Sequence, residues 1–168
     1  MRKTVLLAII AAASFGPVHT QTPSDAVRDP SFATFLRQWE AAQTGFINGD
    51  PSAWKQNTSH GADDTIFGAF GGSERGWKEV SARYDWASGQ FKASGASQKI
   101  EYLNTGASGD LAFTVSIERQ TAQIGGQPKP TSRALRVTQV FRKEDGAWKL
   151  LHRHADPLVE RIPPSERR

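Results

Sequence analysis

The chain has 168 residues with 21 basic and 17 acidic side chains, a length that suits one domain. It contains no cysteine, which excludes disulfides, thiolate catalysis and cysteine-ligated zinc or iron–sulfur sites. The formal charge is +4, but the basic residues are interspersed with acidic ones, so we expect no nucleic-acid partner.

Residues 1–20 have the pattern of an export signal. Arg2 and Lys3 give a positive start, and a short apolar run from Val5 to Ala13 leads to small residues and an expected cleavage after Thr20. No later segment approaches the roughly 18 apolar residues of a membrane span. We therefore expect a periplasmic or secreted protein with no membrane contact beyond this signal, a retained anchor being the alternative.

A polar linker over 21–29 precedes an amphipathic helix. This helix is expected to begin at Asp29 and Pro30 and to end at Gly49-Asp50-Pro51. A short second helix or turn carries Ala53 and Trp54. The apolar side chains of the first helix recur at i, i+3, i+4 and i+7 and are Phe32, Phe35, Leu36, Trp39, Phe46 and Ile47.

The middle of the chain predicts a brief strand within DTIFGAF, then a third helix over Ser73 to Ser88 with Ser73 as its cap. Beyond Gly95 the pattern changes to period two. The turn signal Glu144-Asp145-Gly146 predicts a hairpin between the last two strands, and the tail over 159–168 is predicted to be disordered. Four strands are expected, at Gln98–Asn104, Asp110–Gln120, Arg133–Lys143 and Ala147–Ala155.

Helices followed by an antiparallel meander predict an α+β domain over residues 30–158, with the helices on one face of a curved sheet. In the last strand, WKLLHRHAD, alternation places one set of side chains on one face. This set is Trp148, Leu150, His152, His154 and Asp156. Since the first two are natural core residues, the histidines are expected to extend that core face toward a pocket. A β-bulge would reverse this assignment.

Three interpretations of the His152, His154 and Asp156 spacing compete. A metal site usually needs three converging ligands, and His60 is the only other histidine outside the signal, so we expect no metal and no cofactor. The pair could instead line a pocket and bind or protonate a ligand. It could also consist of ordinary hydrogen-bonded strand residues at a sheet edge or subunit interface.

The run TQVFRKEDGAWKLLHRHAD, Thr138 to Asp156, resembles the final hairpin of SnoaL-like proteins in the nuclear-transport-factor-2-like superfamily. It is also similar to the end of the association domain of calcium/calmodulin-dependent protein kinase II. DDTIFGAFGGSERGW, Asp63 to Trp77, resembles the family's short strand, glycine turn and third helix. The resemblance implies a cone-shaped sheet wrapped on N-terminal helices, a pocket open at one end, and a homodimer formed through the sheet.

The superfamily includes ketosteroid isomerases, cyclases, dehydratases and hydrolases besides adaptors, so the fold does not give the function. Laid on the ketosteroid isomerase pattern, the sequence puts Gly68 at the catalytic aspartate and Gln139 at the oxyanion-hole aspartic acid. That chemistry requires carboxyl groups at both positions. Steroid isomerisation by that mechanism is therefore not expected.

Three functions remain open from the sequence. The first is an exported binding module for a small organic ligand, an acid being one option. The second is a cofactor-free isomerase, cyclase, dehydratase or hydrolase with His152 or His154 as general acid or base, oriented by Asp156, Glu118 or Asp85. The third is a structural dimerisation module. The candidate ligand-binding residues are His60, Arg83, Trp86, Glu118, Arg136, His152 and His154.

Ordinary roles fit several of these candidates equally well. Glu118 and Arg136 could form a cross-strand ion pair on the solvent face. Arg83 and Trp86 lie three residues apart and could share a helix face, but they also fit a solvated arginine and a core tryptophan. The sequence does not decide whether the protein is an enzyme.

Overall fold

The computed structural model describes residues 29–92 and 95–161. The expected signal, most of the linker and most of the tail lie outside these residues, so those assignments stay predictions. Within the described residues no helix is long and apolar enough to cross a membrane. The elements are α2 (Pro30–Ile47), α3 (Ser52–Gln56), β1 (Thr65–Phe67), β2 (Ser73–Arg75), α4 (Trp77–Ser88), β3 (Ser97–Ser108), β4 (Leu111–Ala122), β5 (Thr131–Glu144) and β6 (Ala147–Pro157).

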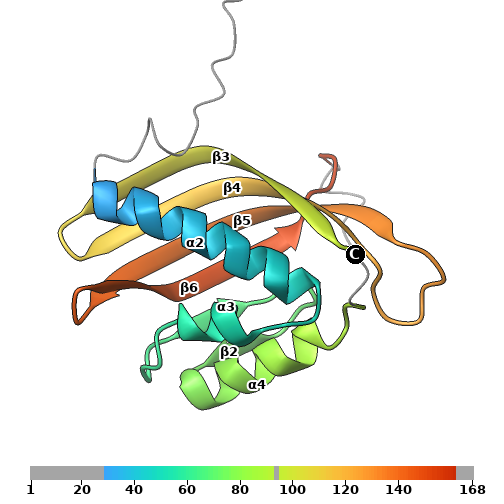
Figure 1. Ribbon diagram of the computed structural model, residues 1–168, viewed down its shortest axis with the longest axis horizontal. Coiled ribbons are helices and arrows are strands. Elements are labelled where there is room, and N and C mark those ends of the chain that lie inside the picture. Colours follow the sequence, from blue (N-terminus) through green and yellow to red (C-terminus); the bar gives the residue numbers. More distant parts are fainter. Residues whose placement is uncertain (1–28, 93–94, 162–168) are drawn as a thin grey trace, which may run out of the picture.

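The six strands form one curved, unclosed sheet in the order β2-β1-β6-β5-β4-β3. β1 pairs with β6 in parallel, and every other pairing is antiparallel. In Figure 1, α2 crosses the four long strands on one face, and α3 and α4 lie beside β6 and β2. The predicted α+β class, with helices packed on one face of a curved sheet, is confirmed.

Helix α2 begins and ends where its sequence signals predict. The Asp29 carboxylate accepts hydrogen bonds from the backbone N–H of Ser31 at 2.8 Å and of Phe32 at 3.3 Å, which caps the helix start. Past its end, Gly49 has a positive φ of 89°, a conformation that glycine adopts without strain. All six predicted stripe residues are buried, so the periodicity of the sequence identified the packed face correctly.

The start of the third helix was predicted wrongly. Ser73 does not cap a helix but begins β2, which pairs with β1 through Phe67. Helix α4 starts only at Trp77, after Gly76 with a positive φ of 78°. The backbone N–H of Gly76 donates to the Asp64 carbonyl at 2.7 Å, so a tertiary contact rather than a side-chain cap fixes this helix start.

A β-bulge in β6 overturns the predicted face of the histidines. His152 is opposite Val140 and Leu150 is opposite Phe141, so Leu151 has no cross-strand partner. One extra residue moves every later side chain to the opposite face. Trp148 and Leu150 face the core as expected, but Arg153 and Ala155 continue that buried face, whereas His154 is exposed.

The inner face of the sheet has a closed end and a polar end. At the closed end, Phe32 packs on Phe141 and Trp148 with ring centroids 5.2 and 5.1 Å apart, distances typical of favourable aromatic pairs. Toward the polar end, the side chains that β4 directs to the inner face are polar and buried. They are Thr114, Ser116, Glu118 and Gln120. Helix packing fills the first end, and polar groups concentrate at the second.

Candidate functional site

A cavity opens at the polar end, between α2, α3, α4, the loop after β1 and the inner face of the sheet. The cavity has a volume of about 50 Å³ for the centres of water-sized groups. On the same measure, a cavity needs roughly 10–15 Å³ to hold one water molecule. The cavity therefore has room for a small ligand of a few heavy atoms or for the end of a larger one. Its aromatic wall consists of Phe46, Trp54, Phe70, Tyr84 and Phe91, and its polar lining of Gln43, Arg83, Gln98, Gln120, Arg133 and Arg153.

Arg153 forms a buried ion pair with Glu118 across the sheet. Its Nη1 and Nη2 donate to Glu118 Oε1 and Oε2 at 2.9 and 2.7 Å, the paired geometry in which arginine binds carboxylates most strongly. The guanidinium also lies 5.2 Å from the ring centre of Trp54. Both side chains are buried, so this pair is electrically neutral and rigidly placed in the cavity wall.

Glu118 therefore pairs with Arg153 and not with Arg136, the partner suggested from the sequence. It faces inward opposite Leu135, and the suggested solvent-face pair with Arg136 does not form. Arg136 is exposed and pairs with Asp156 at 3.7 Å on the outer face. The sequence missed Arg153 because uninterrupted alternation assigns it to the face opposite Trp148.

Arg133 is the second arginine that the sequence reasoning missed. Its Nε donates to Gln120 Oε1 at 2.8 Å, and its guanidinium lies 5.0 and 5.1 Å from the ring centres of Phe70 and Phe91. Burial, with the charge of Arg153 added, lowers its pKa to about 10, so it remains cationic at neutral pH.

Arg133 has no ion-pair partner within the described residues: the charge of Glu118 acts on it from a longer distance, but that carboxylate is paired with Arg153. No described carboxylate lies within ion-pair distance of Arg133. A partly buried cation is costly unless it is paired. Arg133 therefore gives the cavity a positive charge that an anionic ligand would offset.

Arg83 also lines the cavity, as one of the predicted ligand-binding residues. It lies 3.7 Å from Glu74, donates to the Gly71 carbonyl, and packs over the Trp86 ring at 4.5 Å. A Cβ at Gly68 would lie 2.9 Å from Arg83 Nη2. The Arg83 side chain thus lies beside Gly68, the position at which the ketosteroid isomerase pattern has its catalytic aspartate. Trp86 shares the helix face of Arg83 as expected, but it is 49% exposed and does not line the cavity.

The two histidines lie on the outer face of the sheet, away from the cavity. His152 Nδ1 is 2.8 Å from Thr65 Oγ1, and His154 Nε2 is 3.1 Å from the Asp156 carboxylate. Both rings contact Phe67 edge-on at 5.3 Å. Burial and the neighbouring His154 lower the pKa of His152. The geometry of the cavity therefore gives no support to these histidines as its acid or base.

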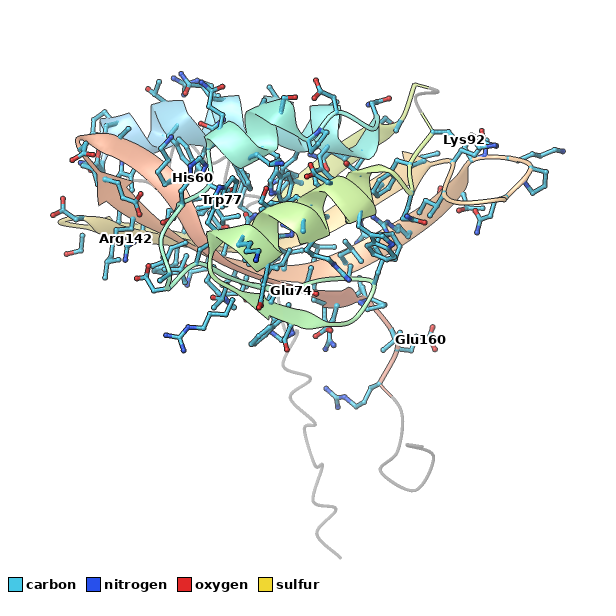
Figure 2. All side chains as sticks on the ribbon, turned by 90° about the horizontal axis from the view of Figure 1, so that it is seen from below. His60, Glu74, Trp77, Lys92, Arg142 and Glu160 are labelled. Carbon is cyan, nitrogen blue, oxygen red and sulfur yellow. The ribbon has the colours of Figure 1, made fainter. Side chains whose placement is uncertain are left out.

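The remaining predicted residues lie elsewhere. His60 stacks on Trp77 at 3.7 Å, and its Nε2 is 3.1 Å from the Lys55 carbonyl; Figure 2 shows the two rings side by side between α3 and the start of α4. Asp85 forms an ion pair with Lys55 at 2.9 Å. Among the described residues no cluster of three or more histidine, cysteine or acidic side chains could hold a metal ion.

Comparison with known proteins assigns the family. The model of the SnoaL-like domain matches residues 34–160. The chain belongs to the SnoaL-like family. No curated protein matches this SnoaL-like sequence.

Solved structures share the fold at low sequence identity. A putative dehydratase of the NTF2-like family from Streptomyces avermitilis is 18% identical, with 83% of this chain and 100% of that chain covered and a TM-score of 0.62. A putative ketosteroid isomerase from Shewanella frigidimarina is 23% identical, with 77% and 98% covered and a TM-score of 0.58. A putative calcium/calmodulin-dependent protein kinase type II association domain from Thiobacillus denitrificans is 18% identical, with 74% and 94% covered and a TM-score of 0.57.

Proposed function

We propose that this SnoaL-like protein binds a small organic monoanion, a carboxylic acid with an apolar body, in the cavity at the polar end of the sheet. The unbalanced charge of Arg133 is the observation that supports this most directly. Arg153 is already neutralised by Glu118, and Arg83 lies near Glu74. Among the described residues that line the cavity, Arg133 is thus the cation without a nearby carboxylate, and such a cation among aromatic side chains matches one carboxylate on an apolar body.

The shape of the surface suggests how the ligand is oriented. A shallow groove crosses the start of β3, the end of β4 and the start of β5, and it shares Gln98, Gln120 and Arg133 with the cavity. Lys99 and Arg119 also line this groove. Arg133 therefore lies where the aromatic cavity meets a basic groove. A ligand would place its carboxylate at Arg133 and its apolar part among Phe46, Phe70 and Phe91.

Butyrate and its neutral analogue butyramide test this proposal by isothermal titration or by chemical-shift changes. We expect butyrate to bind and butyramide to bind at least about tenfold more weakly, because a charge-assisted hydrogen bond contributes about 1.5–3 kcal/mol. The variant Arg133→Gln should lose a similar factor for butyrate. Arg136→Gln, which changes an exposed arginine of the outer face of the same strand, is the matched control and should bind butyrate normally.

Two results would contradict the proposal. One is equal binding of butyrate and butyramide, which would mean that the cavity selects shape alone. The other is unchanged butyrate affinity in Arg133→Gln. The enzymatic alternative with a histidine acid or base has no comparable support, since His60, His152 and His154 all lie outside the cavity lining.

We also propose that the protein forms a homodimer through the outer face of the sheet. Large apolar side chains of β4 are exposed there, Leu111 at 54% and Phe113 at 39%, and Leu103 is 57% exposed at the bulge of the adjacent β3. Contiguous exposed apolar surface on a soluble domain commonly marks an interface, and a second copy presents the same apolar surface. In this arrangement the cavity on the inner face stays open, so binding and dimerisation use opposite faces.

A further inference from the structure

Gln120 is the side chain that anchors Arg133 in the cavity wall. It is 5% exposed, and its Oε1 accepts the hydrogen bond from Arg133 Nε at 2.8 Å. The strand register sets the two residues opposite each other on β4 and β5. This hydrogen bond and the contacts with Phe70 and Phe91 hold the guanidinium in place. No described group accepts a hydrogen bond from its Nη1 or Nη2, so these donors are available to a ligand.

The neighbours of Gln120 determine how its amide is oriented. Arginine only donates hydrogen bonds, so the atom that faces Arg133 must be the amide oxygen. The amide nitrogen, Nε2, then faces two acceptors, Gln98 Oε1 at 3.4 Å and Glu118 Oε2 at 3.5 Å. Gln98 of β3 is oriented in turn, because its Nε2 donates to Gln43 Oε1 of α2 at 3.1 Å. These contacts agree on one orientation of the Gln120 amide.

An uncharged amide satisfies both sides of this position. An ionised glutamate would accept the hydrogen bond from Arg133 equally well, but it could not donate one to Glu118. The Glu118 carboxylate is already paired with Arg153. A glutamate would also place a negative charge in direct contact with Arg133 and offset its positive charge. Glutamine therefore anchors the cation and leaves its charge available.

We propose that Gln120 sets the charge selectivity of the cavity: it holds Arg133 with Nη1 and Nη2 available to the ligand and, as a neutral side chain, preserves the positive charge that selects a carboxylate. This rests on the proposed binding function. Gln120 acts through Arg133 and is therefore a positioning residue. A role limited to holding β3, β4 and β5 together would affect a carboxylate ligand and its neutral amide alike, whereas charge selectivity affects the carboxylate alone.

The variant Gln120→Glu tests this proposal because it changes the charge and keeps the shape. At about pH 8 we expect its carboxyl group to be ionised, since the adjacent Arg133 favours the charged form. Arg133 stays cationic there, because burial lowers its pKa only to about 10. Butyrate should bind at least about tenfold more weakly than to the wild type, as the charge-assisted contact is lost. Butyramide should bind as it does to the wild type, which also shows that the cavity is intact.

The matched control is Gln127→Glu. Gln127 is exposed in the loop between β4 and β5, and its Oε1 accepts a hydrogen bond from Thr131 at 3.0 Å, which a carboxylate oxygen accepts as well. The variant adds the same charge outside the cavity lining, so butyrate should bind normally. An equal loss of butyrate affinity in both variants would assign the effect to net charge and overturn the role of Gln120.

A second measurement tests the anchoring of Arg133 without any ligand. The ¹H–¹⁵N signal of Arg133 Nε can be assigned by its absence in Arg133→Gln. We expect this proton to exchange with water more slowly than the Nε proton of Arg136, which lies exposed on the outer face of the same strand. The variant Gln120→Leu should lose this protection, because it removes the acceptor.

The outcomes separate this inference from the binding proposal. Butyrate binding that Gln120→Glu leaves unchanged would overturn the inference and leave the binding proposal intact. An Arg133 Nε proton that exchanges as fast as that of Arg136 would do the same. Absence of butyrate binding by the wild type would overturn both.

Discussion

The two faces of strand β4 differ in a way opposite to the usual pattern of a half-buried sheet. From Thr114 to Gln120 its inner side chains are polar, whereas the outer side chains include Leu111 and Phe113. Antiparallel sheets usually direct apolar residues inward and polar ones toward water. The inversion is consistent with the two surfaces that we propose, a ligand-binding cavity on the inner face and an apolar dimer contact on the outer face.

Removal of Glu118 should be the most damaging change to the inner face. The variant Glu118→Ala leaves the Arg153 guanidinium buried without its carboxylate, and breaking a buried pair in this way costs about 3–5 kcal/mol. Urea denaturation should show this loss in the free energy of unfolding. Glu101→Ala is the control, because Glu101 of neighbouring β3 pairs with Arg119 at 4.0 Å with both side chains exposed, and such pairs contribute about 1 kcal/mol or less.

The double variant Glu118→Leu with Arg153→Met sharpens this comparison. Removing both charges avoids the unpaired cation, and apolar replacements of buried pairs are often tolerated. We expect the double variant to recover most of the stability that Glu118→Ala loses. A loss in Glu118→Ala no larger than in Glu101→Ala would show that Arg153 reaches water and that the inner face is not sealed at this point.

Asp64 gives the inner face a dependence of stability on pH. Its pKa is about 7 in the folded state and about 3.9 in an unfolded chain. Between these values the unfolded state releases the proton and the folded state keeps it, so the free energy of unfolding falls as the pH rises. This loss is complete above about pH 7 and absent below about pH 4.

The variant Asp64→Asn should lack this contribution. The free energy of unfolding of the wild type relative to the variant should fall by up to about 1.4 kcal/mol per pH unit between pH 4 and 7, and then level off. Denaturant titrations at several pH values measure the difference, which cancels groups common to both proteins. A pH-independent difference would mean that Asp64 is ionised and solvated in the native state.

The sequence predicted what depends on local patterns. The buried stripe of α2 and its Asp29 cap are encoded in neighbouring residues, and the hairpin turn at Asp145 and Gly146 has the positive φ angles, 48° and 81°, that its sequence favours. The fold class and the family resemblance followed from such segments together.

The residues that line the candidate site depend instead on the β-bulge at Leu151, which no local sequence pattern predicts. The bulge at Leu151 contains no glycine or proline, and it alone decides whether Arg153 or His152 faces the core. Alternation likewise divided β4 into a polar and an apolar set without showing which one pointed inward. The contrast between the apolar and the polar side chains of β4 indicated that its two faces have different roles. Only the packing of α2 on the sheet shows that the polar face is the inner one.

A substitution on the outer face should have the smallest effect on the free energy of unfolding and a clear effect on dimer formation. Leu111→Lys places a charge in the exposed apolar surface, so it should shift the monomer–dimer equilibrium toward monomer while the free energy of unfolding of the monomer changes by no more than about 0.5 kcal/mol. Leu158→Lys is the control, since Leu158 is an exposed leucine that follows β6 and lies outside the surface formed by β3 and β4. Sedimentation velocity over a concentration series measures the equilibrium. A wild type that remains monomeric at high concentration, or a dimer that Leu111→Lys leaves intact, would show that the apolar outer face serves another contact.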